Sequence, residues 1–184
     1  MYPKFLNPAY DEVFQLSEKD MEIPKCVVQF QKWKGAPLKE SFGGMPVVSV
    51  EDKPMFAELA VMHHLNNEGW QTRWILTYNR RNKEPLYISA WKDDLYLNQK
   101  HEAIDDANIA EMMKRIAKLN NNSYEGCWDV LAWKQGRVLF AEAKRNNKDL
   151  ESVAKNKWLA AALASGLTPD NFLLVQWDFN PRCA

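Results

Sequence analysis

The chain has 184 residues, of which 46% are hydrophobic, 12% aromatic and 26% charged. These proportions exclude a disordered or fibrous chain, and the length is enough for one domain with its own core. Basic and acidic residues number 24 each, so the formal net charge is zero. No global positive field therefore indicates nucleic-acid or membrane binding, and such binding would need a local charged surface.

The cysteines are scattered and form neither a C-x-x-C pair nor a zinc-ligand spacing: Cys26, Cys127 and Cys183. Free thiols of this kind are typical of a reducing compartment. The longest apolar stretches, such as 158–164, fall far short of the roughly 18 residues that a membrane span needs. The N-terminus also lacks the apolar core of a signal peptide. We therefore expect a cytoplasmic protein without a membrane partner.

The first 50 residues are interrupted throughout by proline and glycine, which break each candidate helix or strand. Two short strands are predicted within them, at 26–31 and 47–50. We expect residues 1–50 to form an N-terminal accessory layer beside a core domain that spans 51–184.

The core begins with a helix predicted over 54–68. Asp52 is its N-cap, Pro54 lies in its first turn and Gly69 ends it. A strand follows at 72–78, where β-branched and aromatic residues are concentrated.

Residues 79–125 are less regular, and we interpret them as an insertion. They contain a polar loop, a predicted strand at 86–91 and a predicted helix at 104–119, whose apolar residues recur at helical spacing.

The C-terminal part has the most regular pattern. Its predicted elements are strands at 128–133 and 138–144, a helix at 149–165 and a last strand at 171–177. Without the insertion, the element order is helix, strand, strand, strand, helix, strand. This order predicts an α/β domain with a mixed sheet.

A two-residue turn at 135–136 joins the first two of these strands. In a type I′ hairpin with this turn, Asp129 lies directly opposite Glu142. Directly opposed residues share a face of the sheet, with Cβ atoms about 4.5–5.5 Å apart. Lys144, two residues beyond Glu142, lies on the same face.

Two carboxylates that face each other repel unless a cation neutralises them. Carboxylate oxygens are the ligands that Mg²⁺ prefers, with waters and substrate phosphates completing its shell. Asp129 and Glu142, with no protein cation expected between them, therefore predict half of a divalent-metal site with Lys144 alongside. The alternative is a solvated Glu and Lys at a strand end, since E-x-K also occurs at 51–53 in a predicted loop.

Glu58 is a third candidate carboxylate. Val61, Met62 and Leu65 follow it at i+3, i+4 and i+7, which places it on or beside the apolar stripe of its helix. Buried acids are rare unless they are paired or bind a metal. The alternative is a glutamate at the edge of the stripe that reaches solvent.

These residues and their order resemble the PD-(D/E)XK nuclease superfamily, and within it most closely the VRR-NUC group. The resemblance covers 54–177 and rests on these residues: Glu58, Gly126-Cys-Trp-Asp129, Glu142-Ala-Lys144, and Ser152, Lys155 and Trp158 of the following helix. It implies a restriction-endonuclease-like core that hydrolyses nucleic-acid phosphodiesters with Mg²⁺ or Mn²⁺.

The resemblance also implies roles for these residues. Asp129 and Glu142 would be metal ligands, Glu58 would support the metal shell, and Lys144 would position or polarise the attacking water. Lys155 departs from the pattern because glutamine is common at its position. This change would move a water- or phosphate-orienting contact onto a cation.

The charges are distributed unevenly along the chain. Residues 134–157 contain seven basic and three acidic residues, whereas 84–111 contain seven acidic and two basic ones. The basic segment lies beside the predicted site, where phosphate contacts are useful. From it we predict three substrate-binding residues: Arg145, Lys148 and Lys155. The alternatives are a solvated helix face or a binding surface elsewhere, around Arg73, Arg80 and Arg81.

Four of the eight tryptophans fall within predicted strands and are expected to pack in the core or on a sheet face: Trp74, Trp128, Trp133 and Trp177. Trp33, between Lys32 and Lys34, is the candidate for a surface contact. Packing within the N-terminal layer is the favoured alternative for it.

The sequence thus predicts a Mg²⁺-dependent nuclease with DNA as the favoured substrate, and it is compatible with a homo-oligomer. Whether such an enzyme cuts internally or from an end stays open. The rival interpretation is a nucleic-acid-binding or scaffold protein that keeps the fold without cleavage, although intact Asp129, Glu142 and Lys144 favour the enzyme. A third interpretation, a metal-independent protein-interaction module, predicts no response to Mg²⁺.

Overall fold

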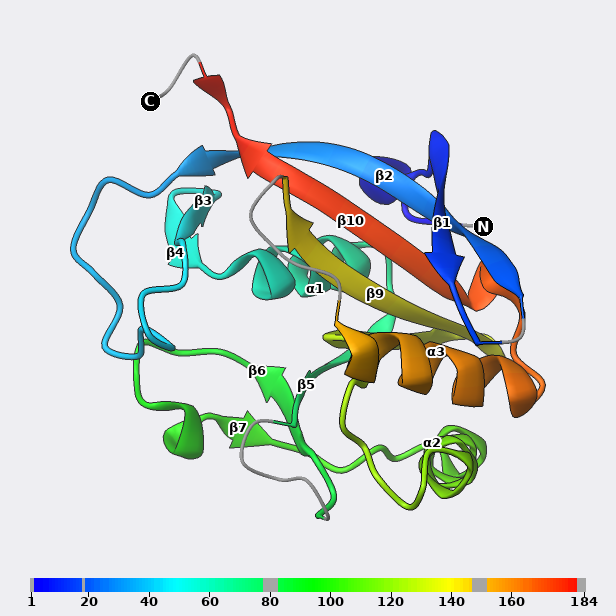
Figure 1. Cartoon of the computed structure of the whole chain (residues 1–184). Coiled ribbons are helices and arrows are strands. Elements are labelled where there is room, and N and C mark those ends of the chain that lie inside the picture. Colours follow the sequence, from blue (N-terminus) through cyan, green and yellow to red (C-terminus); the bar gives the residue numbers. More distant parts are fainter. Residues whose placement is uncertain (1, 18, 78–82, 147–151, 182–184) are drawn as a thin grey trace.

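The computed structural model describes the chain except for residues 1, 18, 78–82, 147–151 and 182–184. Its described part is an α/β protein in which three α-helices pack against one open, mixed, ten-stranded sheet (Figure 1). The helices are α1 (Ala57–Asn67), α2 (Ala107–Leu119) and α3 (Val153–Ala164). The strands are β1 (Tyr10–Gln15), β2 (Asp20–Lys32), β3 (Val48–Val50), β4 (Lys53–Met55), β5 (Gln71–Leu76), β6 (Leu86–Ala90), β7 (Lys100–His101), β8 (Val130–Lys134), β9 (Arg137–Arg145) and β10 (Phe172–Phe179).

The strand order across the sheet is β4-β3-β2-β10-β9-β8-β5-β6-β7, and β1 pairs with β2 outside this path. β10 runs parallel to both of its neighbours, β9 and β2, and the other pairs are antiparallel. The predicted order of the core is confirmed, because α1, β5, β8, β9, α3 and β10 follow one another around the insertion that contains β6, β7 and α2. None of the helices in the described part of the chain is long and apolar enough to cross a membrane.

The N-terminal segment is part of the sheet and not an accessory layer on it. β2 is far longer than the strand predicted at 26–31, and β1 was not expected at all. Pro24 lies inside β2, opposite Asp11 of β1, and the parallel ladder with β10 begins only at Lys25. A proline has no N–H to donate to a ladder. Pro24 is tolerated because it precedes the residues of β2 that pair with β10.

The sheet has a hydrophobic cluster on each face. Alternate residues of β9, Leu139, Ala141 and Ala143, belong to the cluster that includes the buried side of α1, and we name this side the α1 face. Phe140 belongs to the cluster that includes α2 and α3 on the opposite side, the α3 face. Because side chains alternate along a strand, Glu142 and Lys144 point to the α3 face.

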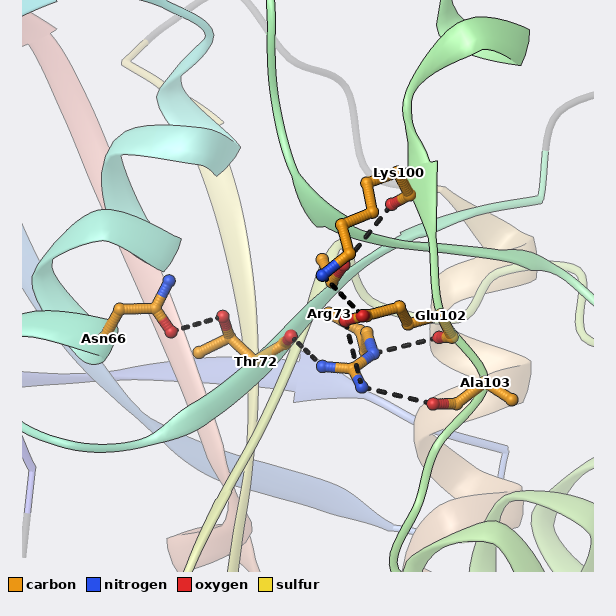
Figure 2. Close-up of polar contacts among 7 residues, drawn as sticks. Asn66, Thr72, Arg73, Lys100, Glu102 and Ala103 are labelled. Atoms are coloured by element: carbon orange, nitrogen blue, oxygen red, sulfur yellow. Dashed lines mark hydrogen bonds and ion pairs between the residues drawn. The ribbon is translucent and has the colours of Figure 1, made fainter.

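A buried arginine holds the insertion against β5 (Figure 2). Arg73, which is 5% exposed, donates from Nε to Glu102 O at 2.9 Å, from Nη1 to Thr72 O at 2.8 Å and from Nη2 to Ala103 O at 3.1 Å. Its guanidinium also lies 5.2 Å from the centre of the Trp133 ring. With its donors engaged in this way, Arg73 is not placed to bind nucleic acid, and Arg80 and Arg81 lie outside the described residues.

Candidate functional site

The β8–β9 hairpin has the register that the sequence predicts. Val130 pairs with Ala141, so the next pair outward is Asp129 and Glu142. Both turn residues, 135–136, have positive φ, of 50° and 76°. Positive φ at both positions defines a type I′ turn, whose twist matches that of the strands. The prediction that these two carboxylates face each other is therefore confirmed.

Asp129 is fixed by its backbone and by its side chain. Its carbonyl oxygen accepts a hydrogen bond of 2.7 Å from the backbone N–H of Ile75 in β5. Its Oδ2 accepts a hydrogen bond of 3.4 Å from the backbone N–H of Ala143 in β9. Asp129 is thus held between β5 and β9, directly before the start of β8.

A lysine from the first turn of α3 lies between the two carboxylates. Lys155 Nζ donates a hydrogen bond to Asp129 Oδ1 at 3.2 Å and another to Glu142 Oε1. The side chains of Asp129, Glu142 and Lys155 expose 22%, 13% and 29% of their surfaces. The expectation that no protein cation stands between the carboxylates is wrong. Sequence spacing did not reveal this contact because it depends on how α3 docks against the hairpin.

A close backbone approach sets the position of Lys155. A Cβ on Gly126 would lie 2.0 Å from Ala154 O and 2.8 Å from the backbone nitrogen of Lys155. Gly126 also has a φ of 83°, which other residues rarely adopt. The glycine therefore lets the first turn of α3 contact the loop that leads into Asp129. About one turn further along α3, Trp158 is fully buried and anchors the helix to the α3 face.

The electrostatics of the cluster favour additional positive charge. Burial and the charge of Asp129 raise the pKa of the Glu142 carboxyl to about 8, although Lys155 acts in the opposite direction. Burial alone would lower the pKa of Lys155, but the two carboxylates outweigh it and raise that pKa above its ordinary value. A cluster of two carboxylates and one ammonium therefore attracts a further proton or a bound cation.

The donor set fits a divalent ion of the magnesium type. Such an ion is usually held by one or two protein carboxylates, with waters and substrate phosphates as its other ligands. Asp129 and Glu142 supply the two carboxylates, and Glu142 Oε2 is buried without a hydrogen-bond partner among the described residues. This oxygen is therefore available as a ligand for a metal ion.

Glu58 does not join this pair. It is 8% exposed and lies on α1, whose buried residues pack on the α1 face, whereas the pair lies on the α3 face. In the part of the chain that the structure describes, no three His, Cys, Asp or Glu side chains gather closely enough to hold a metal ion. The structure thus leaves a site of two carboxylates where the sequence predicted three.

The predicted basic residues have different positions. Lys144 is partly buried on the α3 face, two residues beyond Glu142 and opposite Gln176 of β10. Lys155 contacts the carboxylates themselves. Arg145 ends β9 and, by strand alternation, points to the α1 face. Lys148 lies outside the described residues.

Comparison with known proteins adds no assignment: no family model, curated protein or solved structure matches the chain. The resemblance to PD-(D/E)XK nucleases therefore stays a prediction. The fold and the site define an α/β protein with a mixed sheet and a carboxylate pair on one hairpin, bridged by a lysine.

Proposed function

We propose that the protein is a Mg²⁺- or Mn²⁺-dependent nuclease that hydrolyses phosphodiester bonds of nucleic acid, with DNA as the favoured substrate. The observation that carries the proposal is the facing pair of Asp129 and Glu142 on one hairpin, with Lys144 on the same face. Lys155 offsets only one of the two negative charges, so a site for a further cation explains the facing carboxylates better than architecture does.

The proposed roles follow from the positions of the side chains. Asp129 and Glu142 would hold the ion, which when bound would activate a water and neutralise charge on the phosphate. Lys144 would place a further positive charge on this face, where charge grows on the phosphate oxygens. Lys155 offsets one of the two carboxylate charges in the metal-free protein. With the carboxylates holding an ion, the Lys155 ammonium would contact a substrate phosphate instead of the pair.

A second candidate function is supported by the same lysine. Because Lys155 bridges the carboxylates and offsets one of their two charges, the site has a counter-ion from the protein without metal. A protein of this kind could bind nucleic acid and cleave nothing. The two functions differ in their response to divalent ions, which a nuclease requires and a binding protein does not.

The deciding experiment incubates the purified protein with labelled single-stranded, duplex and branched DNA, and with RNA, in Mg²⁺, Mn²⁺ or EDTA. The chain contains its own control, because Glu51-Asp-Lys53 repeats the E-x-K pattern at the exposed turn between β3 and β4, away from the β8–β9 hairpin. The nuclease predicts cleavage in metal only, lost in Glu142→Gln and Asp129→Asn and retained in Glu51→Gln. Binding without cleavage in any metal would support the second function, and neither binding nor cleavage would exclude both.

A further inference from the structure

Three parallel strands end at one edge of the sheet, and their last residues form a cluster. β2, β9 and β10 run in the same direction, and they end at Lys32, Arg145 and Phe179. In open α/β sheets, ligands bind outside the carboxyl ends of the strands. The edge is therefore a suitable place for a binding surface.

The three side chains lie on the α1 face. Phe179 pairs with Phe30 in the register of β10 and β2, and Lys32 follows Phe30 by two residues. Arg145 pairs with Trp177, which precedes Phe179 by two residues. Because residues two apart point to the same side of a strand, the two cations and the phenyl ring extend one surface.

Direct contacts hold this surface in order. The Arg145 guanidinium lies 4.8 Å from the centre of the Phe179 ring, and Lys32 Nζ lies 5.9 Å from it. Trp177, which is nearly fully buried, meets the Phe179 ring edge-on at 5.6 Å. Asp178 Oδ1 lies 3.6 Å from Arg145 Nε. The cations are thus positioned before any ligand binds, which lowers the entropy lost on binding.

Trp33 extends the cluster along the chain. It directly follows Lys32, is partly exposed and belongs to neither core cluster. Its Nε1 donates to Ala36 O at 2.7 Å, and a Cβ on Gly35 would overlap its ring. The ring is therefore held flat against its own turn, and Lys34 beside it is exposed. The contacts of Trp33 thus lie within residues 1–50, as the favoured expectation has it, and the side chain stays partly exposed.

We propose that Lys32, Trp33, Arg145 and Phe179, the cation–aromatic edge, bind a single-stranded segment of nucleic acid. Lys32 and Arg145 contact phosphates, Phe179 positions both cations, and a base stacks on Trp33. Proteins that bind single strands combine positive charge with aromatic rings in this way, and a duplex hides the base faces that such a ring needs. The inference rests on the proposed function.

The distance to the candidate site fits this role. Arg145 follows Glu142 by three residues of β9, which corresponds to about 10 Å along the strand. Glu142 lies on the α3 face and Arg145 on the α1 face, so a strand held at the edge would pass around the end of β9 to reach the carboxylates. The edge would thus hold the nucleotides that flank the bond to be cut.

The test measures binding of a fluorescent oligothymidylate and of a matched duplex in EDTA, over a range of salt concentrations. Because cleavage needs metal in the proposed function, binding is measured without it. Lys32→Ala and Arg145→Ala should each flatten the slope of log affinity against log salt for the single strand by about 0.7. Trp33→Leu should weaken single-strand binding at least about fivefold, through the lost stacking.

Matched controls come from elsewhere on the surface. Lys114→Ala and Lys118→Ala remove exposed charges from α2, and Tyr10→Leu removes an exposed aromatic ring from β1. These should change neither slope nor affinity, and thermal melts confirm folding of each variant. Unchanged single-strand binding in Lys32→Ala and Arg145→Ala would overturn the inference even if metal-dependent cleavage is present. Equal losses for single strand and duplex in Trp33→Leu would overturn the single-strand assignment.

Discussion

The Lys155 ammonium donates a hydrogen bond to the Glu142 carboxylate, although the two residues lie on different elements, α3 and β9. The same ammonium lies 3.2 Å from Asp129 Oδ1. The carboxylate pair therefore has a counter-ion supplied by the protein. A metal ion at this site would have to compete with Lys155, so this lysine affects both the stability of the metal-free protein and its affinity for metal.

We predict that Asp129→Asn destabilises the metal-free protein by about 1–2 kcal/mol, because it weakens a charged hydrogen bond with Lys155. From the sequence alone we would expect the opposite, since removing one of two repelling charges should not harm the fold. Urea unfolding in EDTA measures the change. Asp178→Asn is the control, because its ion pair with Arg145 is partly exposed and 3.6 Å long and should contribute little. A gain in stability for Asp129→Asn would show that repulsion, and not Lys155, dominates the pair.

We predict that Lys155→Gln increases affinity for Mn²⁺ by about tenfold or more. A unit charge about 4 Å from another contributes about 4 kcal/mol at an effective dielectric constant of 20, and movement of the lysine side chain reduces this effect. The substitution also introduces the glutamine that is common at this position in the PD-(D/E)XK nucleases that the sequence resembles. Calorimetric titration with Mn²⁺ measures the affinity. Lys157→Gln, which removes an exposed charge two residues further along α3, should leave it unchanged.

We predict that Lys144→Ala abolishes cleavage and leaves Mn²⁺ affinity and thermal stability nearly unchanged. Lys144 lies on the face of Glu142 but contributes no oxygen ligand. Single-turnover cleavage of labelled DNA is the measurement. Lys53→Ala, in the second E-x-K sequence, should cleave at the parent rate. Undiminished cleavage by Lys144→Ala would remove this lysine from the mechanism.

We predict that Gly126→Ala destabilises the protein by about 1–3 kcal/mol more than Gly136→Ala does. Both glycines have positive φ, of 83° and 76°, so both substitutions carry a similar conformational penalty. Only at Gly126 would the new Cβ overlap the backbone of α3, because Gly136 has no atom within 4 Å of its Cβ position. Chemical denaturation of the two variants measures the difference. Equal losses would show that the contact between Gly126 and α3 adjusts without strain.

The hairpin could be predicted from the sequence, whereas its cation could not. The turn at Gln135-Gly136 fixes the register locally, so the opposition of Asp129 and Glu142 follows from residue numbers alone. The position of Lys155 depends on the docking of α3, which a local pattern does not encode. Two features of the sequence pointed to this contact. Lys155 stands where the resembling nucleases commonly have glutamine, and Gly126 precedes Asp129.

Long-range pairing limited the other predictions. The parallel ladder of β2 joins residues 25–30 to 174–179, and nothing in the local pattern of β2 identifies its partner. Pro24 also interrupts the strand pattern, so only its second half was predicted. Glu58 was predicted correctly as a buried residue of a helix, but its helix packs on the face of the sheet opposite the carboxylate pair.

The most direct test of the central claim is the effect of Mg²⁺ on the stability of the parent protein and of Glu142→Gln. If Asp129 and Glu142 bind the ion in the native state, Mg²⁺ at about ten times its dissociation constant should stabilise the parent by about 1.4 kcal/mol. Glu142→Gln should lose most of this gain, and Glu51→Gln should keep it. A parent protein whose unfolding free energy is the same in Mg²⁺ and in EDTA, or a Glu142→Gln variant that keeps the full gain, would contradict the account.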